Sequence, residues 1–317
     1  MKKTPRLKNI VVVGGGTGTF TVLAALKAYP VHLTAVVSMA DDGGSTGILR
    51  DQYGVLPPGD VRRALVALSN TSDSLRDLFN YRFVSGDLEG HSFGNLFLGA
   101  LEKIHGNFAS AVSEAGRVLN IKGSVLPVTL DNVRLCARLV DGKLVRGETN
   151  IDIPRERVRA AISNLWLEPK ATINPAALSA LSRADLIVIG PGDVYTSIIP
   201  NLLVVGMPEA IRASNAKKVY ICNLMTKYGE TNGFRAEDFV GAVEQYLGTN
   251  TFDYALFNKT RPPRAVLLRY KKEKAEFVAP PTTRGKNSRY IVADFLDDGS
   301  LIRHASDARL AKTLLSL

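Results

Sequence analysis

Short apolar segments that end in glycines are the feature of this sequence that most constrains its fold. Residues 9–13 run directly into the glycine-rich residues 14–18, and the apolar residues 185–189 end at Gly190-Pro191-Gly192. A helical pattern follows the first turn, and another apolar segment follows that helix. Strand, glycine turn, helix and strand in this order are typical of a parallel sheet with helices on both faces. The sequence therefore predicts an α/β fold with a Rossmann-like, doubly wound and mostly parallel sheet.

Periodicity and chain-breaking residues place the other elements. Strands are expected at residues 32–38, 124–129, 132–140, 218–222, 254–258 and 265–269. Helices are expected at residues 20–28, 60–69, 74–81, 198–213 and 236–247, and at 95–119 with a break near Gly106. Asp141-Gly142 favours a hairpin turn, so residues 124–140 indicate a small inserted antiparallel and helical region. We expect a single domain over residues 1–317, with this insertion at about residues 74–150.

Composition argues against several classes of protein. The chain has 317 residues, of which 45% are hydrophobic, enough for one large core. No apolar run approaches the ~18–20 residues of a membrane span, and the apolar residues 10–13 are too few for a signal peptide. Cys136 and Cys222 stand alone in apolar segments, which favours buried thiols over a disulfide or a zinc site. We therefore expect a soluble, cytoplasmic protein without a membrane span.

The net charge of +10 raises the question of nucleic-acid binding. The excess of basic residues lies at the two ends of the chain, in residues 1–8 and 259–317, and the residues between them are nearly neutral. No basic groove interleaved with aromatic residues accompanies this charge, so the sequence argues against nucleic acid as a partner. A basic C-terminal region that faces an anionic ligand, or a solvated surface, accounts for the charge better.

The first glycine-rich loop is a candidate phosphate-binding site. Glycines let the backbone approach a phosphate, and a helix N-terminus offers free N–H groups and a positive dipole end. The loop lacks the lysine of a Walker motif, and threonine at position 19 breaks the dinucleotide fingerprint GxGxxG. A tight structural turn is the alternative, although three consecutive glycines exceed what a turn requires. The predicted ligand contacts are Gly14, Gly15, Gly16, Thr17, Gly18 and Thr19.

The loop at residues 40–47 adds carboxylates. Asp41 and Asp42 directly after a strand suit a ribose hydroxyl or a Mg²⁺ ion on a diphosphate, and the glycines that follow suit an anion. A surface turn is the alternative. Asp60 either caps the next helix or joins the metal ligands. The predicted metal ligands are Asp41, Asp42 and Asp60, and the predicted ligand contacts are Asp41, Asp42, Gly43, Gly44 and Ser45.

Two later strand ends repeat this pattern. An asparagine directly after residues 218–222 suits a base or a sugar amide, and the nearby hydroxyls suit phosphate. Each motif is weak alone, but the carboxyl ends of parallel strands share one edge, where α/β proteins bind ligands at a topological switch point. The predicted contacts here are Gly190, Pro191, Gly192, Tyr195, Thr196, Ser197, Asn223, Thr226 and Thr231.

The segment His91-Ser92-Phe93-Gly94-Asn95 precedes a predicted helix and has two interpretations. In one, His91 is a general base and Asn95 contacts the ligand. In the other, the segment is a helix cap with a packed or solvated histidine. None of the four histidines lies in a nucleophile-elbow motif, so a Ser-His-Asp triad is not predicted.

Taken together, these motifs resemble the YvcK/CofD-like family, and its YvcK branch more closely. The resemblance covers nearly the whole chain and implies a Rossmann-like core whose loops bind a nucleotide diphosphate. The segments that carry it lie between Val11 and Phe234, with LIRH at 301–304 in addition; they are VVVGGGTGTF, ADDGGSTGILR, PPGDVRRALVALS, HSFGNLFLGAL, RVLNIKGSVLP, ADLIVIGPGDVYTSIIPNLLV and CNLMTKYGETNGF.

The resemblance also implies a ligand and a role. The YvcK branch implies a UDP-sugar, above all UDP-N-acetylglucosamine, bound by a regulator of cell shape, envelope synthesis and growth on gluconeogenic carbon sources. Envelope-synthesis proteins are then candidate partners. Tyr270 would stack on the ligand and Arg303 would meet a phosphate. A homodimer is a further expectation, with no sequence argument behind it.

Two alternatives stay open. The CofD branch implies a Mg²⁺-dependent 2-phospho-L-lactate transferase that uses a nucleotide-diphosphate donor. An NAD(P)-dependent enzyme is the other, although the missing third glycine counts against it.

Four departures from the family pattern bear on the site. Asp193 stands where serine is usual, and its carboxylate would repel phosphate unless it points away or binds a metal. Arg63-Ala64 replaces Asn-Cys, and Asn232 replaces an aspartate. Ala305 also replaces an aspartate, which leaves Ser306 as the only nearby hydroxyl for control by phosphorylation.

Overall fold

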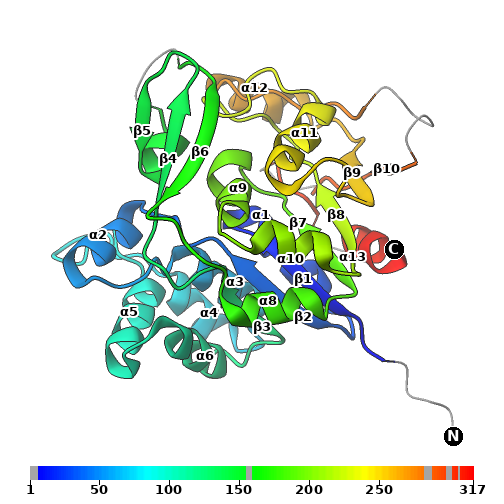
Figure 1. Ribbon diagram of the computed structural model, residues 1–317. Coiled ribbons are helices and arrows are strands. Elements are labelled where there is room, and N and C mark those ends of the chain that lie inside the picture. Colours follow the sequence, from blue (N-terminus) through cyan, green and yellow to red (C-terminus); the bar gives the residue numbers. More distant parts are fainter. Residues whose placement is uncertain (1–5, 155–158, 282–287, 298–301, 306–307) are drawn as a thin grey trace, which may run out of the picture.

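A seven-stranded parallel sheet forms the centre of the computed structural model (Figure 1), which describes residues 6–154, 159–281, 288–297, 302–305 and 308–317. The strand order is β10-β9-β8-β7-β1-β2-β3, and each neighbouring pair is parallel. The strands are β1 (Asn9–Gly14), β2 (His32–Val37), β3 (Ser124–Pro127), β7 (Leu186–Ile189), β8 (Lys217–Ile221), β9 (Tyr254–Asn258) and β10 (Tyr290–Ala293).

The central strands are apolar along their whole length because both faces of the sheet are covered. Ile10 to Val13 in β1 are at most 2% exposed, and β7 is buried throughout. Continuous runs of valine, isoleucine and leucine are typical of strands in such a position. This apolar core fixes where the strands end, and therefore where the loops after them lie.

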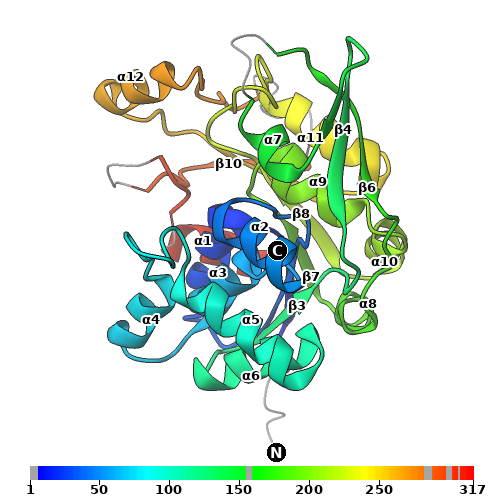
Figure 2. The same cartoon turned by 90° about the vertical axis from the view of Figure 1, so that its left-hand side faces the viewer.

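Helices cover the two faces of the sheet, as Figure 2 shows. On one face α1 packs against α3 and α13, and α6 lies over β3; on the other face α10 packs against α8 and α11. These helices are α1 (Gly16–Leu26), α3 (Gly59–Leu68), α6 (Phe108–Val118), α13 (Ala308–Ser316), α8 (Pro175–Ser182), α10 (Met207–Ala213) and α11 (Ala236–Leu247). The remaining helices are α2 (Gly44–Tyr53), α4 (Asp73–Asn80), α5 (Phe93–His105), α9 (Ile199–Leu202) and α12 (Arg264–Lys272), with a π-helical turn η1 (Val194–Ile198).

A small antiparallel sheet stands apart from the main one, in the order β5-β4-β6. It consists of β4 (Arg134–Leu139), β5 (Leu144–Arg146) and β6 (Ile162–Glu168), and the short helix α7 (Glu148–Asp152) follows β5. The predicted hairpin turn is confirmed, since Gly142 between β4 and β5 has a φ of 86° that glycine tolerates well. The third strand, β6, lies beyond residue 150 and was not predicted from the sequence.

The predicted α/β class and mostly parallel sheet are confirmed, but several elements differ. Residues 124–127 form β3, which pairs in parallel with β2 in the main sheet rather than with β4. The predicted strand 265–269 is wrong: it is helix α12, because a short apolar run has no period long enough to separate strand from helix. The predicted loop 40–47 ends early, since α2 begins at Gly44. The predicted helix 198–213 is interrupted at Gly206, whose φ is 91°.

Candidate functional site

The strand order fixes a topological switch point between β1 and β7. From β1 the chain adds β2 and β3 on one side, and from β7 it adds β8, β9 and β10 on the other. Ligands of open α/β sheets bind beyond the carboxyl ends of the strands at such a point. The loops after the two strands are in close contact here, since a Cβ on Gly18 would lie 2.1 Å from the Pro191 carbonyl oxygen. The glycine therefore permits the first turn of α1 to rest on the loop after β7.

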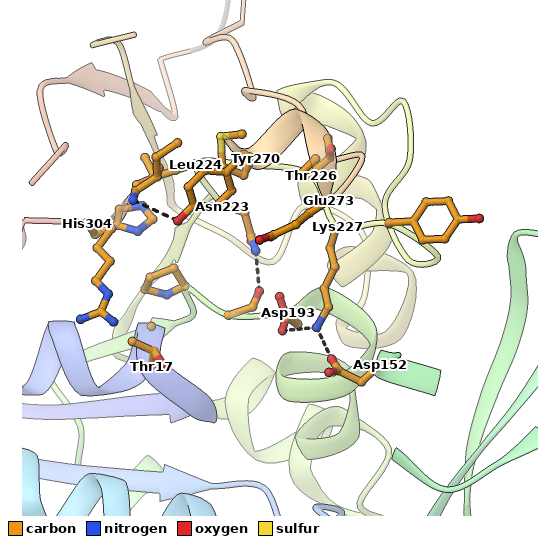
Figure 3. Close-up of a pocket in the computed structure, with 18 of the residues that line it drawn as sticks. Thr17, Asp152, Asp193, Asn223, Leu224, Thr226, Lys227, Tyr270, Glu273 and His304 are labelled. Atoms are coloured by element: carbon orange, nitrogen blue, oxygen red, sulfur yellow. Dashed lines mark hydrogen bonds and ion pairs between the residues drawn. The ribbon is translucent and has the colours of Figure 1, made fainter. Parts of the chain in front are cut away.

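Two adjoining cavities open at this edge. The first has a volume of about 740 Å³, within the range of small-molecule sites. Figure 3 shows side chains from the strand-end loops and from the C-terminal part of the chain around it. Its polar lining is Thr17, Thr21, Asp152, Asp193, Asn223, Thr226, Lys227, Tyr228, Tyr270, Glu273, Arg303 and His304.

Asn223 and the residues from the C-terminal region determine the polar chemistry of the first cavity. The Asn223 Nδ2 donates to the Gly192 carbonyl oxygen at 2.8 Å, and its buried Oδ1 has no hydrogen-bond partner among the described residues. The Tyr270 hydroxyl accepts the Ile302 N–H at 3.1 Å, which joins α12 to the last segment of the wall. Arg303 is exposed beside it.

His304 ends this wall and is buried. Its Nε2 donates to the Cys222 carbonyl oxygen at 3.0 Å. Burial lowers the pKa of His304 to about 4, so the imidazole is neutral at pH 7. The histidine therefore ties the C-terminal segment to the end of β8.

Lys227 is surrounded by carboxylates on one side of the first cavity. Its Nζ contacts Asp193 Oδ2 at 2.6 Å and Asp152, as Figure 3 shows. It also lies 3.5 Å from Glu230 Oε1. Burial lowers the pKa of Lys227, but the three carboxylates more than offset this and raise it well above its usual value. Burial also raises the pKa of Glu230 to about 7. The ammonium supplies the positive charge that a metal would otherwise bring to these carboxylates, and Asp193 is turned to Lys227.

The second cavity has a volume of about 460 Å³ and shares six lining residues with the first: Thr17, Gly18, Asp152, Ile153, Gly192 and Asp193. Three arginines line it, Arg62 and Arg63 from α3 and Arg82 from the segment after α4. The Arg62 Nε donates to Asn95 Oδ1 at 3.1 Å, and Asn95 Nδ2 donates to Ser45 Oγ at 3.3 Å.

Five carboxyl groups also line the second cavity: Asp41, Asp60 and Glu148, and in addition Asp152 and Asp193, which contact Lys227. Asp60 Oδ1 accepts the Gly16 N–H at 2.9 Å, and burial together with the neighbouring Asp41 raises the pKa of Asp60 to about 6. Burial first, and then Asp41 and Asp152, raise the pKa of Glu148 to about 9. The predicted role of Asp60 as a helix cap is wrong: α3 begins one residue earlier, at Gly59, so the carboxylate is free to hold the first turn of α1.

The structure brings most of the predicted site residues to these two cavities. The first cavity is lined by Thr17, Gly18, Pro191, Gly192, Asn223, Thr226, Tyr270 and Arg303. The second is lined by Gly15, Gly16, Asp41, Gly43, Gly44, Ser45, Asp60, Asn95, Thr196 and Ser197. Among the described residues, those that line neither are Gly14, Thr19, Asp42, Gly190, Tyr195 and Thr231.

Several residues outside both cavities support the loops instead. The Asp42 carboxylate accepts the N–H groups of Thr149 at 2.9 Å and Glu148 at 3.2 Å, and so holds the start of α7. The Thr19 hydroxyl donates to the Gly15 carbonyl oxygen at 3.1 Å, and the Thr231 hydroxyl accepts the Lys227 N–H at 2.9 Å.

The segment before α5 is a helix cap with a packed histidine. Ser92 Oγ accepts the Asn95 N–H at 3.3 Å, and the buried His91 Nδ1 lies 3.1 Å from Ser45 Oγ. Of the LIRH motif, Leu301 lies outside the described residues, as does Ser306.

Sequence reasoning missed the basic groups of the site other than Arg303. Arg62, Arg82 and Lys227 were not predicted, and Arg63 was noted only as a departure from a family pattern. The one available signal was the pair Arg62-Arg63 directly after the Pro-Pro-Gly-Asp turn. No sequence pattern indicated Arg82, because only the packing of α4 and α5 brings its segment to the strand ends.

Comparisons with known proteins identify relatives of this chain by sequence and by structure. The family model CofD, 2-phospho-L-lactate transferase, matches residues 10–296. A protein of Thermotoga maritima is 49% identical over 270 residues, 85% of this chain and 84% of that protein. A gluconeogenesis factor of Halalkalibacterium halodurans is 46% identical over 306 residues, 94% of this chain and 92% of that protein. A crystal structure of a protein from Bacillus halodurans superposes with a TM-score of 0.93 at 42% identity, over 98% of this chain and 100% of the other.

Membrane-spanning helices are absent from the part of the chain that the structure describes: none of its helices combines the necessary length and apolar character.

Proposed function

Since this chain belongs to the CofD family, we propose that its first cavity binds a UDP-sugar, UDP-N-acetylglucosamine, as the signal of a regulatory protein. The name gluconeogenesis factor, carried by the relative from Halalkalibacterium halodurans, supports a role in growth on gluconeogenic carbon sources. Control of cell shape and envelope synthesis, through contacts with envelope-synthesis proteins, is the further part of the proposal. Such a protein would act in the cytoplasm, where the nucleotide sugar is made.

The observation that carries the proposal is the position of the first cavity at the switch point of the sheet. Thr17 and Gly18 in the first turn of α1 line it, so the positive end of that helix faces a bound diphosphate. Arg303 offers a guanidinium to the same phosphates from the opposite wall. The unpartnered Oδ1 of Asn223 suits an N–H donor such as the imide of uracil, because a buried acceptor without a partner is costly.

Binding without turnover is supported by the state of the ionisable groups around this cavity. His304 donates to a backbone carbonyl and is held neutral, and Lys227 is committed to three carboxylates. A general acid or base needs a proton to exchange with the substrate. Both groups are engaged elsewhere, which favours a sensor over a catalyst.

Calorimetric titration with UDP-N-acetylglucosamine, GDP and NAD⁺ tests the proposal. We expect the UDP-sugar to bind at micromolar concentration or tighter, to be recovered unchanged, and to lose at least tenfold in affinity in Arg303→Ala, because one charge-assisted hydrogen bond is worth about 1.5–3 kcal/mol. The matched control is Lys271→Ala, which removes an exposed cation from α12 outside the cavity lining. Preference for GDP, or equal loss in both variants, would contradict it.

A second function is favoured by the carboxyl groups of the second cavity. A Mg²⁺-dependent transferase that uses a nucleotide-diphosphate donor would hold its ion through Asp41 and Asp60, with Glu148 beside them. These groups fit a cation, since burial and then the neighbouring carboxylates raise the pKa of Asp60 and of Glu148, and a divalent ion would offset both effects. Asp42 is engaged with the N-terminus of α7, so we assign the ion to the other two aspartates.

The same titration decides between the two functions. When bound, the ion would neutralise charge on the phosphates of the donor. Binding of GDP that requires Mg²⁺ and is lost in Asp60→Asn, or any release of free nucleotide from a nucleotide-linked donor, would favour the transferase. Binding of the UDP-sugar that is indifferent to Mg²⁺ would favour the regulator.

A further inference from the structure

We propose that the second cavity is a separate binding site for a small phosphorylated metabolite, a phosphomonoester, held by Arg62, Arg63 and Arg82. This site is distinct from the nucleotide cavity of the proposed function, and the inference stands or falls independently of it. Three features of the cavity support it: the charge of the arginines, the prepared geometry of Arg62, and an uncapped helix.

The arginines form a concentration of positive charge. Burial, and then the neighbouring guanidinium groups of Arg63 and Arg82, lower the pKa of Arg62 to about 10. All three stay cationic at neutral pH, so the cavity holds like charges close together at an energetic cost. The salt bridge from Arg63 to Asp60 spans 3.6 Å and involves a half-exposed side chain, which gives it little strength. A bound anion would relieve this repulsion.

Arg62 is held ready for a ligand. It is only 7% exposed, its Nη1 donates to Asn80 Oδ1 at 2.7 Å, and its Nε is bound by Asn95, as described above. Its Nη2 has no hydrogen-bond partner among the described residues, although Arg62 lines the cavity. A buried guanidinium with one donor left over in a cavity is suited to a phosphate oxygen, with the rest of the side chain already fixed.

The N-terminus of α2 adds uncharged donors. Gly44, Ser45 and Thr46 of its first turn line the cavity, and no side chain caps the helix. The first N–H groups of an uncapped helix, together with its dipole, attract anions. The helix and the arginines therefore face the same space with the same sign of charge.

The carboxyl groups of this cavity are largely neutralised or engaged. Glu148, with its pKa of about 9, is protonated at neutral pH and offers an O–H donor. Asp41 accepts the Gly43 N–H at 2.9 Å and the Thr46 hydroxyl at 2.9 Å, and Asp60 accepts the Gly16 N–H. Asp152 and Asp193, which also line the cavity, are paired with Lys227. The three arginines thus outweigh the two remaining aspartates, and this surplus of positive charge favours an anion such as a phosphomonoester.

The ligand is a small one, with its phosphate at the arginines. The second cavity, at about 460 Å³, is smaller than the first, which at about 740 Å³ has room for a nucleotide sugar by itself. Arg62, Arg63 and Arg82 line only the second cavity. A polar metabolite beside the phosphate would meet Asn95, Thr149 and Ser197, which line the same cavity. The buried hydroxyl of Thr149 has no partner among the described residues and is available to it.

Calorimetric titration of the full chain with inorganic phosphate and with glycerol 3-phosphate tests the site. We expect glycerol 3-phosphate to bind at least as tightly as inorganic phosphate, and each of Arg63→Gln and Arg82→Gln to weaken both by about tenfold or more. Both arginines are exposed, so neither variant threatens the fold. Arg117→Gln is the matched control: like Arg63, Arg117 pairs with an acidic residue three positions earlier, but it lies on α6, away from the cavity.

A second titration, in saturating UDP-N-acetylglucosamine, separates this site from the nucleotide cavity. Phosphate binding that persists, with an unchanged affinity for the UDP-sugar in Arg82→Gln, supports two sites. Displacement of phosphate by the UDP-sugar, rejection of glycerol 3-phosphate, or equal binding by Arg82→Gln and Arg117→Gln would overturn the inference. If wild-type protein binds phosphate through the arginines but no UDP-sugar, the proposed function fails and this site stands.

Discussion

The first cavity has two walls of different construction. Thr17, Gly18, Gly192, Asn223 and Lys227 follow the buried strands β1, β7 and β8, and we call them the strand-end wall. The facing residues, from α12 and residues 302–304, form the C-terminal wall. Helix α12 has no buried residue and stands away from the sheet in Figure 2.

The difference between the walls lies in what holds each one in place. The strand-end wall is continuous with the apolar core, so its atoms cannot move without disturbing packed strands. Within the C-terminal wall the Tyr270 hydroxyl accepts the Ile302 N–H, and the hydrogen bond from His304 to the Cys222 carbonyl oxygen joins this wall to the end of β8. Substitutions in the first wall should therefore cost stability, and those in the second should cost mainly affinity.

Lys227→Met should have the largest effect on the strand-end wall. Loss of the ammonium leaves Asp152, Asp193 and Glu230 close together and unpaired, which we expect to lower the free energy of unfolding at pH 7 by about 3 kcal/mol. The measurement is urea unfolding. Asp193→Asn in the same chain should restore part of the loss, and stability within about 0.5 kcal/mol of wild type would show that the ion pairs contribute little.

Gly18→Ala should have the second largest effect on the strand-end wall. The new methyl group would meet the Pro191 carbonyl oxygen at 2.1 Å, so the first turn of α1 must move off the loop after β7. We expect a loss of about 2 kcal/mol in unfolding free energy together with weaker binding of the UDP-sugar. Gly241→Ala is the control, because a Cβ on that glycine inside α11 would meet no atom within 4 Å, and the variant should gain about 0.5–1 kcal/mol in unfolding free energy. Equal stability of the two variants would argue against close contact of the loops.

His304 tests the point where the C-terminal wall is anchored. Its pKa falls from about 6.5 when unfolded to about 4 when folded, so the unfolded chain binds a proton first as the pH falls. Protonation of His304 therefore does not lower the free energy of unfolding above pH 6.5. Between pH 6.5 and 4 this free energy decreases, and at pH 5 the decrease is about 2 kcal/mol. Urea unfolding midpoints over this pH range should show the decrease in the wild-type protein and not in His304→Asn. Replacement of the exposed His105 by asparagine should leave the wild-type slope unchanged.

Tyr270→Phe should have the smallest effect on stability. It removes the hydroxyl that accepts the Ile302 N–H, a partly buried hydrogen bond worth about 1 kcal/mol. Because α12 buries none of its residues, we expect a change in unfolding free energy of about 1 kcal/mol or less, but a fivefold or greater loss of UDP-sugar affinity. Thermal unfolding and calorimetry on the same sample measure both. A large loss of stability without a change in affinity would reverse the comparison of the walls.

Sequence patterns predicted the strand-end wall well and the C-terminal wall poorly. Apolar runs that end in glycine, such as the one before Gly14, have few alternatives to a buried parallel strand, and β1, β7 and β8 are where they were expected. The run around Val266 is too short and too exposed to carry a period, and it was taken as a strand although it is α12. Tyr270 and Arg303 entered only through a family resemblance, since nothing local places them at the strand ends.

Sequence patterns also failed to predict the partners of charged groups. Asp60 was expected either to cap α3 or to join the metal ligands, yet its carboxylate accepts the N–H of Gly16 on another helix. Asp193 was expected to repel phosphate unless it points away or binds a metal; it is turned to Lys227, 34 positions later in the chain, a partner that the sequence did not indicate. A sequence names such ionisable groups but not their partners.

The sequence by itself determined the class of fold, the glycine turns and the single edge at which the loops meet. Periodicity and backbone conformation are local properties, and neighbouring residues suffice to specify them. Only the tertiary structure decided that this edge holds two cavities, that three arginines face the second, and that Lys227 sits among carboxylates. Those facts depend on distances and burial between residues far apart in the chain, because electrostatic energies change with both.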